Sequence, residues 1–213
     1  MGRERLVLVF GDSITWGAWD PEGGWVQRLR RYMEAKDKVE KNYTAIYNLG
    51  IDGDDSTGVR KRFEPEARTR LFEGAEVTMI FAVGINDSRM DEQTGETKTP
   101  VRRFSSNLAV IFARATRMTQ KVYCVGLTRV NEKKTRPTMW NANVSYINDV
   151  IKRFDDALKI TCRNSCVPYI PVSDVFDTEK HLDDDGLHPN AKGHELVYEK
   201  VKTALEKAGI LSR

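Results

Sequence analysis

Five short runs of apolar residues recur along the chain, separated by longer stretches in which apolar residues return every three or four positions. The short runs lie at residues 5–10, 45–49, 77–83, 122–127 and 167–170. Runs of this length that are apolar at nearly every position are typical of strands buried on both faces. The longer stretches predict amphipathic helices at residues 24–36, 57–72, 101–116, 140–163 and 191–208.

Residues that favour helix starts stand before three of these stretches. Ser56 precedes the second stretch, Thr99 and Pro100 precede the third, and Asn190 precedes the last. Hydroxyl and amide side chains accept hydrogen bonds from the free N–H groups of a first turn, and proline fits the first helical position. Pro65 falls within the second stretch, so this helix is expected to kink there or to begin late.

Strands that alternate with helices predict a parallel sheet covered on both faces, because right-handed crossovers place the helices there. We expect a three-layer α/β/α, flavodoxin-like fold with a five-stranded sheet in the order 2-1-3-4-5. The length of 213 residues fits a single domain over residues 1–213, and no internal repeat divides it. In this strand order, ligands bind at the carboxyl ends of the strands, near the first and third.

The composition is that of a globular protein and points away from nucleic acids and membranes. Lys and Arg number 34 against 31 Asp and Glu, an excess too small and too evenly spread to predict a nucleic-acid partner. No apolar stretch approaches the length of about 20 residues that crosses a bilayer. The run at residues 6–10 is shorter than the core of an export signal. We therefore expect no membrane insertion and a cytoplasmic location.

The three cysteines, Cys124, Cys162 and Cys166, are an odd number and have no further Cys or His at metal-binding spacing. Buried thiols in a reducing compartment are expected, with no metal site.

A serine stands directly after the first predicted strand, in the string Gly11-Asp12-Ser13-Ile14-Thr15. Gly11 permits a tight turn, from which Ser13 can point into the ligand crevice. The string is not the nucleophile elbow of the α/β-hydrolases, because Thr15 occupies a position that requires glycine. By itself, Ser13 fits equally well as the cap of a helix that begins near Ile14.

An acid and a histidine lie three residues apart near the C-terminus, at Asp185 and His188. A serine hydroxyl becomes a strong nucleophile when an imidazole takes its proton, and the imidazole needs an acceptor for its other nitrogen. Asp185 and His188 can supply both groups from one loop. His181 and His194 fit surface or packing positions better.

Two further turns carry donors for a negatively charged oxygen. Residues 48–56 follow the second strand and contain Gly50 and Gly53, where the backbone can approach a ligand closely. Asn86 follows the third strand and has a side-chain amide. With the backbone N–H of Ser13, Gly53 and Asn86 would hold the oxyanion of an acyl-transfer reaction. Four turns that meet at one edge of a sheet indicate a site rather than packing.

These four strings resemble, in order and spacing, the sequence blocks of the SGNH or GDSL-like hydrolase family, over nearly the whole chain. The resemblance implies Ser13 as the nucleophile, Asp185 and His188 as the rest of a triad, and Gly53 and Asn86 in the oxyanion hole. It also implies the fold and the absence of a cofactor. It leaves the substrate open, since these enzymes act on acyl esters, thioesters, lysophospholipids and acetylated sugars.

Three of the four tryptophans, Trp16, Trp19 and Trp25, closely follow the predicted nucleophile in the sequence. Trp16, Trp19 and Trp140 could form an aromatic wall for an acyl group or a sugar ring, whereas Trp25 fits packing of the first long helix. Because no long apolar helix is present to cover a lipid tunnel, a short-chain ester is the preferred small-molecule substrate, with an O-acetylated carbohydrate as one example.

Two other functions stay open at this point. One is a lysophospholipase or acyl-thioesterase with the same triad. The other is a non-catalytic, flavodoxin-like binding module in which Asp12 and Asp87, at strand ends, hold a metal or a phosphate. The second leaves Gly53 and the pair formed by Asp185 and His188 unexplained.

Overall fold

A parallel sheet forms the centre of the computed structural model, which describes residues 3–37 and 42–211. Its strands run in the order β2-β1-β3-β5-β7, and every neighbouring pair is parallel. This is the predicted order, and each strand overlaps one of the five apolar runs. Their bounds are β1 (Arg3–Gly11), β2 (Asn42–Gly50), β3 (Glu76–Ala82), β5 (Lys121–Val125) and β7 (Tyr169–Ile170).

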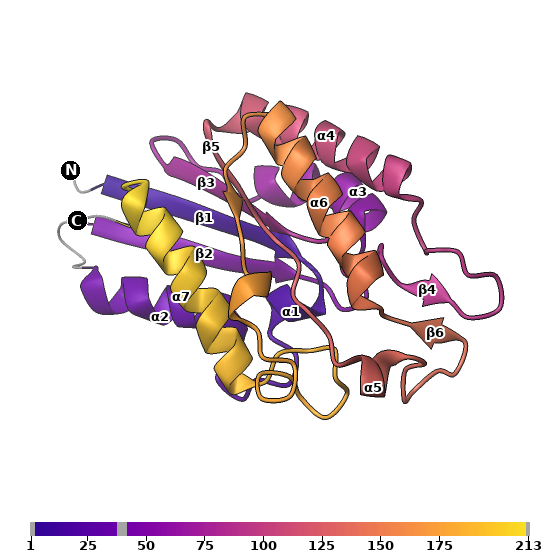
Figure 1. Cartoon of the computed structure of the whole chain (residues 1–213). Coiled ribbons are helices and arrows are strands. Elements are labelled where there is room, and N and C mark those ends of the chain that lie inside the picture. The colour runs from indigo at the N-terminus through magenta and orange to yellow at the C-terminus, as the bar shows by residue number, and fades with distance from the viewer. Residues whose placement is uncertain (1–2, 38–41, 212–213) are drawn as a thin grey trace.

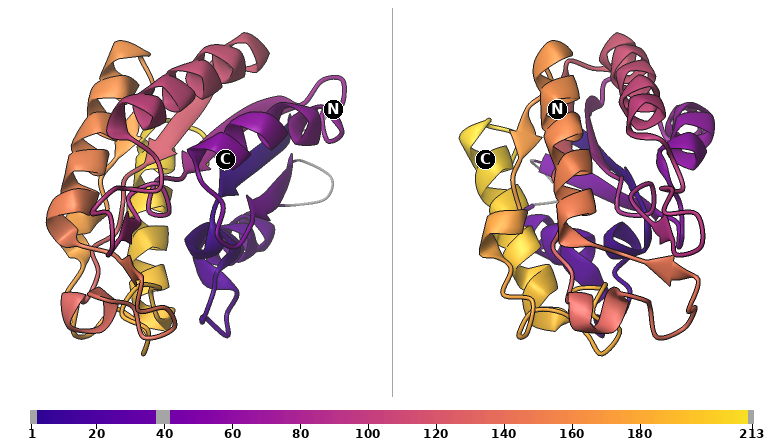
Figure 2. Two further views of the ribbon diagram at one scale, coloured as in Figure 1. Left: turned by 90° about the vertical axis from the view of Figure 1, so that its right-hand side faces the viewer. Right: turned by 45° about the vertical axis from the view of Figure 1, so that its right-hand side comes forward.

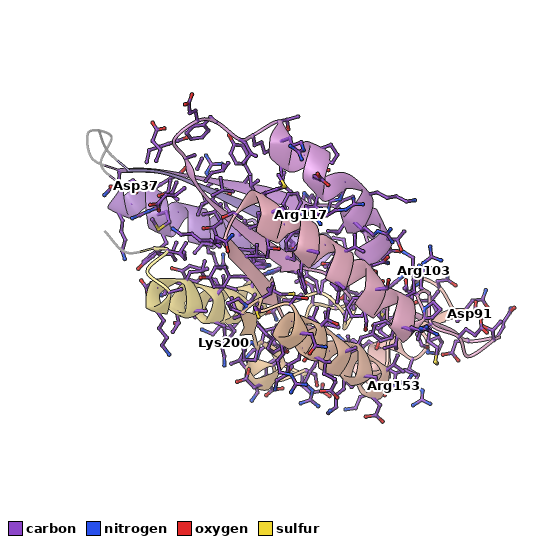
Figure 3. The ribbon with its side chains drawn as sticks, turned by 90° about the horizontal axis from the view of Figure 1, so that it is seen from above. Asp37, Asp91, Arg103, Arg117, Arg153 and Lys200 are labelled. Carbon is purple, nitrogen blue, oxygen red and sulfur yellow. The ribbon has the colours of Figure 1, made fainter. Side chains whose placement is uncertain are left out.

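Helices cover both faces of this sheet (Figures 1 and 2). Helices α2 (Gly24–Lys36) and α7 (Ala191–Lys207) pack together on one face. On the other face, α4 (Val101–Met118) packs between α3 (Ser56–Arg68) and α6 (Asn148–Asn164). The three-layer α/β/α fold is therefore confirmed. Figure 3 shows charged side chains around the whole outline, from Lys200 on α7 to Arg103 on α4, in keeping with evenly spread charge.

Alternation along β1 explains why its run is continuously apolar. Leu8 and Phe10 enter the core under α3, α4 and α6, whereas Val7 and Val9 enter the core under α2 and α7. Successive side chains of a strand point to opposite faces, so a strand with a helix layer on each side needs apolar residues throughout. Trp25 is fully buried in the second of these cores, as its predicted packing role requires.

Helix α6 begins at Asn148, so the prediction of a helix from residue 140 was wrong. The preceding residues form a turn and a short strand, β6 (Val144–Ser145), which pairs antiparallel with β4 (Met90–Asp91). In this turn the side chain of Asn141 accepts a hydrogen bond from the backbone N–H of Asn143. Asparagine side chains that bond the local backbone in this way compete with helix formation.

The starts of the other helices agree only in part with the prediction. Asn190 caps α7 through bonds from Lys192 and Gly193, as expected. Asp55, and not Ser56, caps α3. No side chain caps α4, where Pro100 occupies the capping position and Thr99 is not used.

Pro65 lies inside α3, which extends from Ser56 to Arg68 rather than starting late. The missing N–H of a proline removes one bond to the preceding turn. Because Pro65 stands near the end of the helix, the first turns are unaffected and the helix stops soon after it.

Cys124 and Cys162 are buried in the core, but Cys166 is exposed, so the expectation of three buried thiols was wrong for Cys166. It lies beyond the last residue of α6, outside the apolar face of that helix. Within residues 3–37 and 42–211, no helix is both long and apolar enough to span a bilayer.

Candidate active site

Ser13 lies at the carboxyl end of β1 and is the first residue of the short helix α1 (Ser13–Trp16). The carboxylate of Asp12, and not Ser13, caps this helix by accepting a hydrogen bond from the N–H of Ile14. The turn is tight because Gly11 has no side chain. A Cβ atom there would lie 2.3 Å from the carbonyl oxygen of Ala82, so only glycine fits.

Ser13, His188 and Asp185 form a continuous chain of hydrogen bonds. The Oγ of Ser13 lies 2.8 Å from Nε2 of His188, and Nδ1 of His188 lies 2.6 Å from Oδ2 of Asp185. Burial alone would raise the pKa of Asp185, but hydrogen bonds from His188 and from the backbone N–H of Leu187 lower it to about 2. Asp185 is therefore ionised at neutral pH and can orient the imidazole.

The loop that carries Asp185 and His188 is held at both sides. The N–H of Asp183 donates to the carbonyl of His188 over 2.9 Å, and the N–H of Asn131 donates to the carbonyl of Gly186 over 2.8 Å. Gly186 has a left-handed φ of +72° and faces the residues around α5 (Glu132–Thr135) too closely for a side chain. A loop fixed in this way keeps the imidazole aimed at Ser13.

Asn86, at the end of the neighbouring strand β3, is buried and makes two hydrogen bonds. Its Nδ2 donates to the carbonyl of Asp54 over 2.9 Å, and its Oδ1 accepts from the hydroxyl of Tyr146 over 3.0 Å. An amide nitrogen carries two hydrogens, so one remains for a ligand. No pattern in the sequence indicated Tyr146, which lies in a stretch wrongly predicted as helix.

Two backbone donors accompany Asn86 at this edge of the sheet. Gly53 adopts a left-handed φ of +70°, and the space where its Cβ would lie is open. Among the described residues, the N–H groups of Gly53 and Ser13 have no hydrogen-bond acceptor. The register pairs Gly11 with Gly50 on one side and with Ala82 on the other, so these turns leave adjacent strand ends.

Trp19 reaches the same site from the loop after α1. Its indole Nε1 donates to Oδ2 of Asp185 over 2.8 Å, and its ring meets the ring of His188 edge-on. Trp16 and Trp140 are exposed, by 59% and 52%. Within the part of the chain that the structure describes, neither side chain has a ring contact or a hydrogen bond with the three linked residues. Nothing in the sequence indicated the bond made by Trp19.

A family model described as the GDSL-like Lipase/Acylhydrolase family matches residues 9–196, which is most of the chain. The chain belongs to this family. The resemblance inferred from the four strings is thereby confirmed, and with it membership of a family of hydrolases.

Relatives of this GDSL-like chain are distant in sequence but cover it almost completely. The uncharacterized protein YpmR of Bacillus subtilis (strain 168) is 21% identical over 98% of this chain and 84% of its own. The crystal structure of a lipase/acylhydrolase from Enterococcus faecalis has a TM-score of 0.74 and 21% identity, covering 96% of both chains. A variant of Axe2, an acetylxylan esterase from Geobacillus stearothermophilus, has a TM-score of 0.71 and 15% identity, covering 100% of this chain and 98% of that one. At these identities, the structures show a shared fold.

Asp12 and Asp87 serve the GDSL-like fold as internal hydrogen-bond acceptors. Asp12 caps α1, and Asp87 accepts bonds from the N–H and the hydroxyl of Ser56. Burial raises the pKa of Asp12 to about 7 and that of Asp87 to about 6, against the effect of these bonds. Within the described residues, no group of three or more His, Cys, Asp and Glu side chains could hold a metal ion. Both carboxyl groups are thus engaged by donors of the protein itself.

Proposed function

We propose that this GDSL-like protein is a serine esterase that hydrolyses short-chain carboxylic esters through an acyl-enzyme on Ser13. The observation that carries this proposal is the chain of hydrogen bonds from Ser13 through His188 to Asp185. In this chain the proposed base, His188, lies between the proposed nucleophile, Ser13, and the carboxylate of Asp185, which is the spatial arrangement that acyl transfer uses.

In the proposed reaction, Oγ of Ser13 attacks the ester carbonyl while Nε2 of His188 takes the hydroxyl proton. Asp185 accepts the hydrogen bond from Nδ1 and stabilises the imidazolium ion. Collapse of the tetrahedral intermediate breaks the bond to the alcohol, which leaves with the proton from His188. A water molecule, deprotonated by His188, then attacks the acyl group and releases the acid and free Ser13.

The negative charge on the carbonyl oxygen would be held by the N–H groups of Ser13 and Gly53 and by the amide of Asn86. These groups support the role because each retains a hydrogen with no acceptor among the described residues. Donors that are already oriented cost no reorganisation as charge develops in the transition state.

The preferred substrate is a short-chain ester, with O-acetylated carbohydrates as the favoured class. Trp16, Trp19 and Trp140 offer exposed aromatic surface, and rings of this kind stack on sugars and acyl groups. The shared fold with an acetylxylan esterase is in keeping with this choice. No cofactor is proposed, and a cytoplasmic location stays a prediction.

Labelling with a fluorophosphonate tests the mechanism without assuming a substrate. The wild-type protein should be labelled on Ser13 and should hydrolyse 4-nitrophenyl acetate. Ser13→Ala should fold normally, escape labelling and lose on the order of 10⁴-fold in kcat. If Ser13→Ala keeps more than about a tenth of the wild-type rate, Ser13 is not the nucleophile.

A panel of esters with increasing acyl length tests the substrate class. Rates that fall beyond the shortest acyl groups support the short-chain proposal. Rates that rise with chain length, or that are higher for thioesters, would instead favour a lysophospholipase or acyl-thioesterase.

A further inference from the structure

We infer that Trp19 is a positioning residue of the triad, which holds the carboxylate of Asp185 in line with His188 through its indole N–H. This inference rests on the proposed function, because it concerns how the same three residues are kept in register.

The bond from Trp19 completes the hydrogen bonding of Asp185. Oδ1 accepts from the N–H groups of Leu187 and His188 at 2.8 and 2.9 Å. Oδ2 accepts from Nδ1 of His188 at 2.6 Å and from Nε1 of Trp19 at 2.8 Å. An ionised carboxylate has about four acceptor sites, so these donors occupy all of them. With every site bonded, rotation of the carboxylate away from His188 breaks several bonds together.

Trp19 also contacts the second member of the triad. Its ring centroid lies 6.4 Å from that of His188, with the two ring planes 81° apart. Edge-on pairs at this distance are favourable for aromatic rings. One rigid side chain therefore touches both the base and its orienting carboxylate, although the tryptophan itself is 64% exposed.

The backbone at Trp19 adopts an unfavourable conformation, and the loop that contains it is closed by a tight contact between two glycines. Trp19 has a left-handed φ of +63°, a conformation that is unfavourable for a residue with a side chain. Two glycines, Gly17 and Gly24, touch at the base of its loop: a Cβ atom on Gly24 would lie 2.4 Å from the Cα of Gly17. This contact fixes both ends of the loop.

Polar side chains hold the same loop from inside. The buried carboxylate of Asp20 accepts bonds from the N–H of Gly24 and pairs with Arg28 at 3.1 Å. Nε2 of the buried His194, on α7, lies 3.2 Å from the carbonyl oxygen of Ala18, next to Trp19. The loop is thus bonded on both sides of Trp19. These bonds hold the exposed indole where its N–H can donate to Asp185.

Trp19→Phe tests the inference, since it keeps an aromatic ring and removes the N–H. Hydrogen bonds to charged groups are among the stronger ones, and exposure reduces their effect. We expect kcat for 4-nitrophenyl acetate to fall about 5- to 20-fold, with KM within about 2-fold of the wild type. The melting temperature should change little. Unchanged kcat, or a raised KM with normal kcat, would overturn the inference.

Glu22→Gln is the matched control for disturbance of the loop. Glu22 lies in the same loop and pairs with Arg31 at the surface, away from the triad. It should leave kcat and KM at wild-type values. If Glu22→Gln lowers kcat as much as Trp19→Phe does, the loop as a whole is responsible and Trp19 has no specific role.

A double-mutant cycle decides whether Trp19 acts through Asp185. In an Asp185→Ala background, the indole has no carboxylate to hold, so adding Trp19→Phe should change the remaining rate by less than about 2-fold. Loss by the same factor in both backgrounds would show that Trp19 acts independently, and the inference would fail. Failure of the proposed function is separate, because it would appear as persistent activity in Ser13→Ala.

Discussion

The hydroxyl of Tyr146 donates a hydrogen bond to the side-chain oxygen of Asn86, and both residues are buried. Burial raises the pKa of Tyr146 to about 12, so the hydroxyl keeps its proton. Because Oδ1 of Asn86 is bonded on this side, its nitrogen faces the other way, toward the carbonyl oxygen of Asp54. The bond from Tyr146 thus helps to orient the side-chain amide of Asn86, which we propose as a donor in the oxyanion hole.

Tyr146→Phe should lower kcat about 10-fold and leave KM nearly unchanged. The amide of Asn86 would lose its orienting bond, and a buried oxygen left without a donor costs about 1 to 3 kcal/mol. Steady-state kinetics on an acetyl ester and urea unfolding measure the two effects. A variant with wild-type kcat would show that Asp54 alone is enough to orient Asn86.

Asn86→Ala should lower kcat by roughly 10²- to 10³-fold with a small change in KM, the range for loss of one oxyanion donor. Asn86→Asp should be at least as harmful, because a carboxylate would face both the oxyanion and the carbonyl of Asp54. Kinetics and melting temperature are measured on both variants. A large fall in melting temperature with normal turnover of the folded fraction would leave Asn86 a structural role only.

Activity should survive exhaustive dialysis against EDTA, since every proposed step uses a protein group. The rate on an acetyl ester before and after dialysis, and after addition of Zn²⁺, Mg²⁺ or Mn²⁺, provides the measurement. Loss of activity that one of these ions restores would require a metal in the mechanism.

His194 should make the protein less stable in acid. Burial lowers its pKa from 6.5 to about 4, although its contact with the Ala18 carbonyl opposes the shift. Between these values the unfolded chain binds more protons than the folded one, so stability is fully present above pH 6.5 and is lost as the pH falls toward 4. The contribution lost by about pH 4.5 is on the order of 2 to 3 kcal/mol.

Urea unfolding of the wild type and of His194→Gln, each at neutral and acid pH, isolates this contribution. Gln keeps a donor for Ala18 but does not titrate. The variant should lose less free energy of unfolding on acidification than the wild type does. An equal loss in both proteins would mean that carboxyl groups whose pKa is lowered in the folded state, such as Asp185, set the acid sensitivity instead.

The strands of the sheet and their order could be predicted from the sequence, because a strand that is buried on both faces is apolar at nearly every position. The linked side chains of Ser13, Asp185 and His188 were likewise predictable, since their residue types follow strand ends in a family's order. The start of α6 could not be predicted in this way. It depends on a turn in which Asn141 accepts a hydrogen bond from Asn143, and such a turn leaves no trace in the spacing of apolar residues.

The contacts of Trp19 and Tyr146 were unpredictable for a different reason. Each depends on a backbone conformation or a turn in one segment that brings the side chain to a residue on a distant one. Trp19 needs a left-handed φ held by Gly17 and Gly24. Tyr146 needs the short strand β6 in place of a helix. Neither requirement leaves a periodic pattern in the sequence.

Ser13 and His188 are separated by 175 positions in the chain, yet their side chains touch. Contacts between such remote segments carry a large loop-closure cost, and we expect this one to form after the local helices. During refolding from denaturant, helical signal should therefore return before esterase turnover does. A ribosome-bound chain that has emerged only as far as α6 would lack His188, the proposed base for Ser13, so we expect hydrolysis to begin only after the last segment docks against the first.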